Sequence, residues 1–123
     1  EKLDAVGGPT LGADPIVAAV ALTFAQKGQP INAFIIRKEP KAHGTAKWCE
    51  GPELKPGARV AILEDVCTTG GSALKAIEAM RQQYQPSVAL VSCLVDRMEG
   101  AEEAFKKADI RFKPVFTRRD FGK

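Results

Sequence analysis

The protein has 123 residues, of which 45% are hydrophobic, 27% are charged and 7% are aromatic. This length suits one compact domain, and the composition excludes the disordered and fibrous classes. A net charge of +3 favours anionic ligands, but basic and aromatic residues do not alternate along one element as they do in nucleic-acid-binding proteins. We therefore expect a single folded domain that does not bind nucleic acid.

No stretch of the sequence approaches the roughly 18 consecutive apolar residues of a membrane span. The first residues lack the basic start and apolar core of a signal peptide, so a cytoplasmic protein without membrane contact is expected. The three cysteines form no C-x-x-C pair, and the single histidine, His43, has no partner at metal-ligand spacing. Neither a zinc site nor a disulfide framework is expected.

Strands and helices alternate in the predicted element order. An apolar stretch over residues 3–6 predicts a strand, and Asp14-Pro15 predicts the N-cap and first residue of a helix that Gly28 ends. Further elements are expected as strands at 31–36, 59–65, 86–95 and 110–116 and as helices at 72–84 and 99–108. Five strands and three helices in this order predict an α/β fold with a mostly parallel five-stranded sheet flanked by helices.

The stretch from Arg37 to Ala58 has neither helical nor alternating periodicity. It exceeds the roughly 12 to 15 residues of ordinary structureless connections, and loops of that length are usually active-site loops or disordered linkers. Basic side chains gather in its first half, at Arg37, Lys38, Lys41, His43 and Lys47. A solvated basic loop is the default interpretation unless an anion binds nearby.

An anion site is predicted directly after the strand at 59–65. The turn Thr68-Thr69-Gly70-Gly71-Ser72 consists of small residues and leads into a helix. The glycines can adopt positive φ and expose backbone N–H groups, the hydroxyls add donors, and a helix N-terminus attracts negative charge. A phosphate monoester therefore fits this turn.

Two acids, Glu64 and Asp65, end the strand that precedes this turn. Carboxylates at this point can accept hydrogen bonds from adjacent sugar hydroxyls or hold a water-coordinated Mg²⁺. A phosphate site beside such acids predicts a ribose 5-phosphate site. The spacing matches neither a Walker loop nor a dinucleotide-binding motif. The alternative is that the acids only end a strand and the glycines only form a tight turn.

Residues 60–72 resemble the phosphoribosyl-diphosphate (PRPP) signature of the type I phosphoribosyltransferases. Within that family the chain is most similar to the orotate phosphoribosyltransferases: residues 37–45 resemble their catalytic loop, and residues 95–100 resemble their Asp-Arg-x-Glu segment. Residues 8–15 lie where the family has its diphosphate-binding loop. The resemblance covers nearly the whole chain and implies the type I phosphoribosyltransferase fold, without the N-terminal hood segment that covers the base.

The resemblance implies an enzyme that transfers phosphoribosyl from PRPP to orotate, giving orotidine 5'-monophosphate and diphosphate in pyrimidine (UMP) biosynthesis. It also implies Mg²⁺ as cofactor and a homodimer in which loop cations reach the neighbour's site. Two other functions stay open, namely a PRPP-binding regulatory module and a phosphoribosyltransferase for another base.

Site residues follow from the resemblance position by position. Lys41 and His43 would be catalytic, and Thr68 and Arg97 would contact orotate, although Arg97 could instead brace the following helix. Mg²⁺ would be held through PRPP, with water-mediated contacts to the two acids. The residues expected to bind PRPP are Arg37, Lys38, Lys41, His43, Glu64, Asp65, Val66, Cys67, Thr68, Thr69, Gly70, Gly71 and Ser72.

Two loops complete the expected domain, which spans residues 1–123. Ordering the catalytic loop, about residues 38–52, costs more conformational entropy than its few apolar contacts offset, so we expect it to be mobile and to close on PRPP and Mg²⁺. In the diphosphate loop Gly12 replaces a lysine that some orotate enzymes have, so backbone N–H groups would hold the diphosphate. The resemblance also implies a cis peptide at Thr10-Leu11.

Overall fold

Parallel strands form the centre of the molecule, in a computed structural model that describes residues 2–41 and 47–122. No helix within these ranges is long and apolar enough to cross a membrane. The elements are β1 (Ala5–Pro9), α1 (Asp14–Gln26), β2 (Asn32–Lys41), β3 (Lys47–Glu50), β4 (Arg59–Cys67), α2 (Gly71–Met80), β5 (Ser87–Asp96), α3 (Ala101–Lys107), β6 (Phe116–Thr117) and a short 3₁₀ helix, η1 (Arg118–Phe121).

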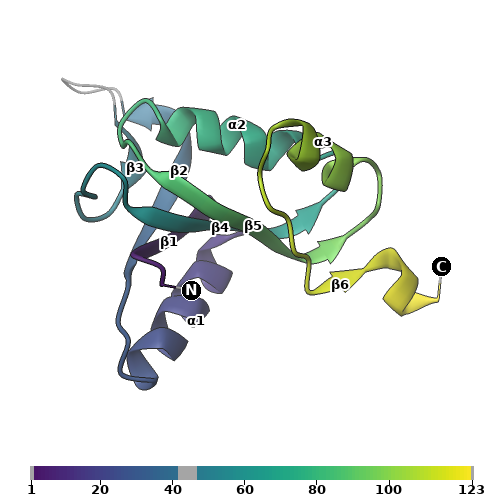
Figure 1. Cartoon of the computed structure of the whole chain (residues 1–123), viewed down its shortest axis with the longest axis horizontal. Helices are drawn as coiled ribbons and strands as arrows, with labels where there is room; N and C mark the ends of the chain where they lie inside the picture. The colour runs from purple at the N-terminus through teal and green to yellow at the C-terminus, as the bar shows by residue number, and fades with distance from the viewer. Residues whose placement is uncertain (1, 42–46, 123) are drawn as a thin grey trace.

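The strands form one six-stranded sheet in the order β3-β2-β1-β4-β5-β6. All neighbouring pairs are parallel except β2 and β3. Figure 1 shows α1 on one face of the sheet and α2 and α3 on the other. The expected α/β class is confirmed, and the sheet has one strand more than the predicted five.

The central strand β4 is apolar because both of its faces are covered. Val60 and Ile62 pack into the cluster beneath α2 and α3. Ala61 and Leu63, which alternate with them, pack into the cluster beneath α1. A strand buried on both faces has a continuous apolar sequence, and this is why the sequence predicted it well.

The prediction of a structureless stretch over residues 37–58 was wrong in part. β2 continues to Lys41, and residues 47–50 form β3, the additional strand, which lies antiparallel at the sheet edge. Its four residues are too few and too polar to give a clear period. Residues 42–46, including His43, lie outside the described residues, and the mobility of the catalytic loop stays a prediction.

Smaller differences concern the ends of elements. Ala13, not Asp14, occupies the N-cap of α1, and the Asp14 carboxylate instead accepts a hydrogen bond from the Thr10 hydroxyl (2.8 Å). α2 begins at Gly71, one residue before the predicted start. The last strand covers only Phe116–Thr117, because the chain after α3 pairs with β5 only at its end and at one isolated bridge.

One side chain holds the edge strand β3 in place. The Gln83 Oε1 atom accepts hydrogen bonds from the backbone N–H groups of Trp48 and Cys49, both at 2.9 Å, and Gln83 Nε2 donates to the Cys49 carbonyl at 3.3 Å. Gln83 lies just after α2 and satisfies backbone groups that an edge strand leaves unpaired. It therefore joins β3 to the helical layer.

Replacing Gln83 by alanine should lower the free energy of unfolding by roughly 1–3 kcal/mol, because the Trp48 and Cys49 N–H groups lose their acceptor. Urea unfolding followed by circular dichroism measures this. Gln82→Ala is the matched control, since Gln82 is exposed, and its effect should stay within about 0.5 kcal/mol. Equal losses of unfolding free energy in the two variants would contradict the role of Gln83 in holding β3.

Candidate functional site

The site is built at the carboxyl end of β4, where a tight turn leads into α2. Gly70 is the N-cap of α2 and has φ 86°. A Cβ on Gly70 would lie 3.2 Å from the Ala101 Cα and 3.4 Å from the Phe105 ring. Glycine is thus required both by the backbone conformation and by the close approach of α3. Gly71, contrary to expectation, does not have positive φ.

The turn presents several hydrogen-bonding groups at the first residues of α2. Thr69 Oγ1 accepts a hydrogen bond from the Gly71 N–H (3.3 Å), and Ser72 Oγ donates to Glu64 Oε2 (3.3 Å). Thr69, Gly71 and Ser72 are exposed. The first N–H groups of a helix lack intrahelical partners, so they and the helix dipole favour a phosphate at this point.

Glu64 is one of two buried charged or polar residues in the described part of the chain, with 6% of its surface exposed. Besides the Ser72 hydroxyl, its Oε1 atom accepts a hydrogen bond from the Asp65 N–H (3.2 Å). Burial, with a smaller contribution from Asp65, raises the pKa of Glu64 from 4.5 to about 7. Near neutral pH this carboxyl group can therefore exist in either protonation state.

Asp65 faces the loop that follows β1. A Cβ on Gly12 would lie 2.6 Å from Asp65 Oδ2, so the loop reaches this carboxylate only because residue 12 is glycine. The expected cis peptide at Thr10-Leu11 is confirmed in the same loop. The predicted diphosphate loop and the predicted sugar-binding acid are therefore direct neighbours.

Arg97 lies immediately after β5, at the same carboxyl ends of the parallel strands as the residues above. Its backbone N–H donates to the Cys67 carbonyl at 2.9 Å, and this places it beside Thr68. Its Nε atom pairs with Glu99 Oε2 at 3.3 Å, and both side chains are exposed. The alternative expectation, that Arg97 braces the start of the next helix, is consistent with this pair.

Val66 and Cys67 differ in what they offer to a ligand. Val66 is exposed, whereas only 3% of the Cys67 surface is exposed and its side chain belongs to the core. The neighbouring Cys93 thiol, together with burial, raises the pKa of Cys67, so the Cys67 thiol stays protonated. Cys67 can serve the site only through its backbone.

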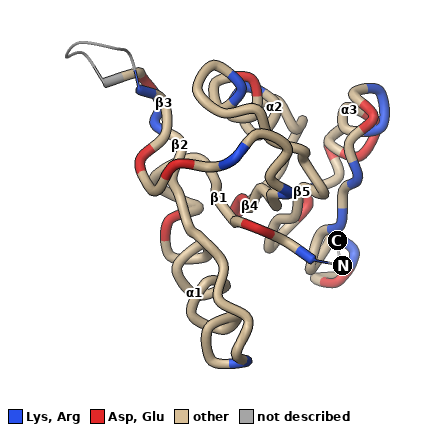
Figure 2. Tube along the Cα trace, turned by 60° about the vertical axis from the view of Figure 1, so that its left-hand side comes forward, with Lys and Arg blue, Asp and Glu red and all other residues tan. Residues whose placement is uncertain are grey.

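Arg37 and Lys38 of β2 line a neighbouring cavity of about 690 Å³ between α2, the end of β1 and the strands β2 and β3. Arg37 Nη1 pairs with Glu50 Oε2 at 3.2 Å, and Figure 2 shows basic and acidic residues side by side near β3. Sequence reasoning missed Trp48 and Lys75 in the lining. Lys75 follows Ser72 by three residues, a helical spacing that could have indicated it.

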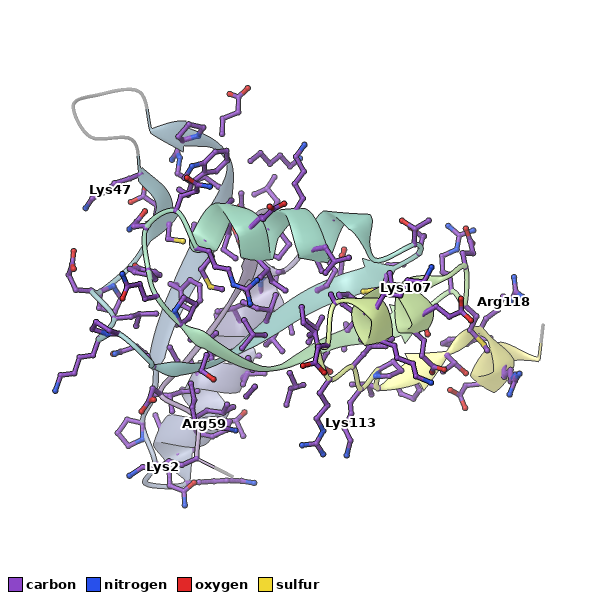
Figure 3. The ribbon with its side chains drawn as sticks, turned by 45° about the horizontal axis from the view of Figure 1, so that its top comes forward. Lys2, Lys47, Arg59, Lys107, Lys113 and Arg118 are labelled. Carbon is purple, nitrogen blue, oxygen red and sulfur yellow. The ribbon has the colours of Figure 1, made fainter. Side chains whose placement is uncertain are left out.

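The structure does not place every predicted cation. The side chain of Lys41 and all of His43 lie outside the described residues. Lys47 is exposed and points away from the sheet at the outer end of β3, whereas Arg118, in η1, lies at the opposite end of the molecule (Figure 3). Arg118 is exposed to solvent.

Metal-binding groups are few at this site. Within residues 2–41 and 47–122 no group of three or more His, Cys, Asp or Glu side chains could hold a metal ion. Glu64 and Asp65 offer carboxylate oxygens beside the diphosphate loop. Mg²⁺ commonly binds through one or two carboxylates together with substrate phosphates, so this donor set fits an ion that arrives with a phosphorylated substrate.

Comparison with known proteins identifies the class. The model of the phosphoribosyl transferase domain matches residues 1–120, and the chain therefore belongs to the phosphoribosyltransferase family. Orotate phosphoribosyltransferase of Synechocystis sp. is 49% identical over 121 residues, which are 98% of this chain and 60% of the relative. The enzyme of the same name from Aquifex aeolicus is 50% identical over 113 residues, 92% of this chain and 61% of the relative.

Solved structures agree with this assignment. The Mycobacterium tuberculosis orotate phosphoribosyltransferase in complex with PRPP has a TM-score of 0.80 and 37% identity, covering 100% of this chain and 67% of that one. The same enzyme in complex with Fe(III) dicitrate has a TM-score of 0.85 and 41% identity over the same shares. The resemblance to orotate phosphoribosyltransferases is confirmed, and the chain spans about 60% of the length of the curated relatives it matches.

The raised pKa of Glu64 should make stability depend on pH. Below its ordinary pKa of 4.5 the carboxyl is protonated in both the folded and the unfolded state. Between 4.5 and about 7 only the unfolded state loses the proton, so the free energy of unfolding falls with rising pH, by up to roughly 3 kcal/mol in total.

A Glu64→Gln variant tests this, because glutamine stays neutral at every pH. The difference in unfolding free energy between the variant and the wild type should grow from pH 4 to pH 8, in favour of the variant. Denaturant titrations at several pH values measure it, and other carboxylates cancel in the difference. A difference that is the same at every pH would rule out the raised pKa.

Proposed function

We propose that this chain is the PRPP-binding core of an orotate phosphoribosyltransferase, which transfers phosphoribosyl from PRPP to orotate and releases diphosphate. One observation supports this most directly. The paired acids, the glycine turn at the start of α2, the Gly12 loop and Arg97 all lie at one edge of the sheet. The names of the relatives support the choice of orotate as acceptor, and a place in pyrimidine (UMP) biosynthesis is proposed because the product would be orotidine 5'-monophosphate.

Each end of PRPP has groups suited to it. The 5-phosphate would be bound by the turn from Thr68 to Ser72, whose hydroxyls and free N–H groups are donors. Glu64 and Asp65 would accept hydrogen bonds from the ribose hydroxyls. The diphosphate would lie against the N–H groups of the Gly12 loop, which has the Asp65 carboxylate as its direct neighbour.

Arg97 would bind the orotate carboxylate, with Thr68 beside it. A guanidinium has two edges, and the ion pair with Glu99 uses Nε on one of them. The terminal nitrogens can still form a bidentate pair with a ligand carboxylate. An arginine in this position favours an acidic pyrimidine over a neutral base.

The chemical step would be displacement of diphosphate from the anomeric carbon by an orotate nitrogen, through an oxocarbenium-like transition state. Negative charge builds on the leaving diphosphate, and preorganised cations stabilise it. Arg37, Lys38, Lys41 and His43 would supply these charges. Orotate binds as an anion, so its nitrogen requires no general base.

Mg²⁺, when bound with PRPP, would neutralise charge on the diphosphate. Glu64 and Asp65 would hold it, directly or through water, and the loop cations act on the same leaving group. The homodimer, in which loop residues reach the partner's site, and the cytoplasmic location remain proposals from the sequence.

The decisive assay follows orotate absorbance in the presence of the protein, PRPP and Mg²⁺. Orotate should be consumed, and Lys41→Ala should lower kcat by about 10²- to 10³-fold because it removes a cation from the leaving group. Lys47→Ala is the matched control, since Lys47 is exposed and is the register partner of Lys41 in the antiparallel pair of β2 and β3. It should change kcat by less than about tenfold.

Other outcomes of the same assay separate the alternatives. PRPP binding without orotate consumption would favour a regulatory module. Consumption of another base in place of orotate would keep the phosphoribosyltransferase class and replace the acceptor. Equal losses in Lys41→Ala and Lys47→Ala would remove the special role of Lys41.

A further inference from the structure

We propose that Asp96 is a positioning residue that holds Arg97 in place for the orotate carboxylate, by fixing the turn between β5 and α3. The inference rests on the proposed function, in which Arg97 binds orotate. Asp96 is not among the residues that the sequence motifs assigned to either substrate. Its role follows from burial, one hydrogen bond and the backbone conformation that this bond supports.

Asp96 is the last residue of β5, and only 4% of its surface is exposed. Burial of a carboxylate is costly unless hydrogen bonds compensate for the lost water. Asp96 Oδ1 accepts a hydrogen bond from the Met98 N–H at 2.9 Å. This bond from a side chain to the backbone two residues later closes an Asx turn over Arg97.

The backbone after Asp96 adopts a conformation that the turn must stabilise. Met98 has φ 60°, although it is not glycine, and residues other than glycine are disfavoured in this left-handed region. Gly100 follows with φ 113° as the N-cap of α3. The chain thus reverses between β5 and α3 through two left-handed residues, and the Asp96 carboxylate bonds to the first of them.

Arg97 is held on both sides by this arrangement. Its own N–H donates to the Cys67 carbonyl at 2.9 Å, and the next N–H, that of Met98, donates to Asp96. Two successive backbone groups are therefore fixed, the first against the end of β4 next to Thr68 and the second against the end of β5. The side chain of Arg97 starts from a defined point above the place where the ribose and the base would meet.

The ion pair with Glu99 cannot supply the same precision. Its side chains are 58% and 42% exposed, for Arg97 and Glu99 respectively, and exposed pairs contribute little and hold their geometry loosely. The Asp96 carboxylate, by contrast, is buried, and its bond to the Met98 N–H is partly buried. A bidentate arginine–carboxylate contact depends on placement of the guanidinium to within about 0.5 Å, so the backbone anchor governs orotate affinity.

Steady-state kinetics with both substrates tests the proposal. Asp96→Ala should raise KM for orotate about tenfold or more. It should change KM for PRPP less than about twofold, because the turn from Thr68 to Ser72 and the acids Glu64 and Asp65 do not lie on β5 or in the turn after it. Asp96→Asn keeps the Oδ1 acceptor and should stay within about threefold of the wild type for both substrates. Asp4→Ala, which removes a carboxylate–backbone bond of 2.8 Å at the opposite end of β4, should show no selective effect on orotate.

Two double variants separate positioning from general packing. In an Arg97→Ala background, Asp96→Ala should have almost no further effect on KM for orotate. Met98→Gly added to Asp96→Ala should recover at least threefold of the lost KM, because glycine adopts φ 60° without cost. If Asp96→Ala does not fold, Asp96→Ser replaces it, since serine forms the same turn more weakly and should give an intermediate KM.

Equal rises in both KM values, or an Asp96→Asn variant as impaired as Asp96→Ala, would overturn the positioning role. An effect of Asp96→Ala that persists in full without Arg97 would overturn it as well. A wild-type protein that binds PRPP but does not consume orotate would instead refute the proposed function, and the Asp96 role with it. A rise in KM for orotate alone, in an enzyme that is still active, is thus distinct from absence of the activity.

Discussion

The site depends on the buried Glu64 side chain near the end of β4, whose carboxylate accepts hydrogen bonds from the Ser72 hydroxyl and the Asp65 N–H. It connects the last residues of the central strand to the first turn of α2. The connection is possible because Gly70 lets the chain turn sharply against α3. The core of the fold therefore places Glu64, the turn from Thr68 to Ser72 and the N-terminus of α2 relative to one another.

Parallel topology brings the other parts of the site to the same carboxyl ends of the strands. The loop after β1 meets Asp65 at Gly12, where the absence of a side chain lets the carboxylate lie against the loop, and the turn after β5 reaches the end of β4 through the Arg97 backbone. Each of these loops follows a different strand, yet all three meet because parallel strands end on one side of the sheet. Under the proposed function, the phosphate, the sugar and the acidic base would lie side by side along the ends of these strands.

The central strands and the phosphate turn were predictable because their signals are local. β4 is a continuous apolar run, and the acids, glycines and hydroxyls that follow it are adjacent in the sequence. β3 was not predictable, because its pairing depends on Gln83, which lies 34 residues beyond Cys49. The role of Asp96 was also hidden, since burial of its carboxylate depends on how the elements around the β5–α3 turn pack. The catalytic role of His43 remains a prediction from the sequence.

The central claim is that the turn from Thr68 to Ser72, with its two neighbouring acids, binds a phosphorylated ribose. Titration of ¹⁵N-labelled protein with ribose 5-phosphate, followed by the chemical shifts of assigned backbone amides, tests it most directly. The account predicts that the largest shift changes fall on the amides of residues 68–72, with smaller changes at Glu64 and Asp65. Unchanged amides in this turn, or larger changes at the opposite end of the strands, would contradict it.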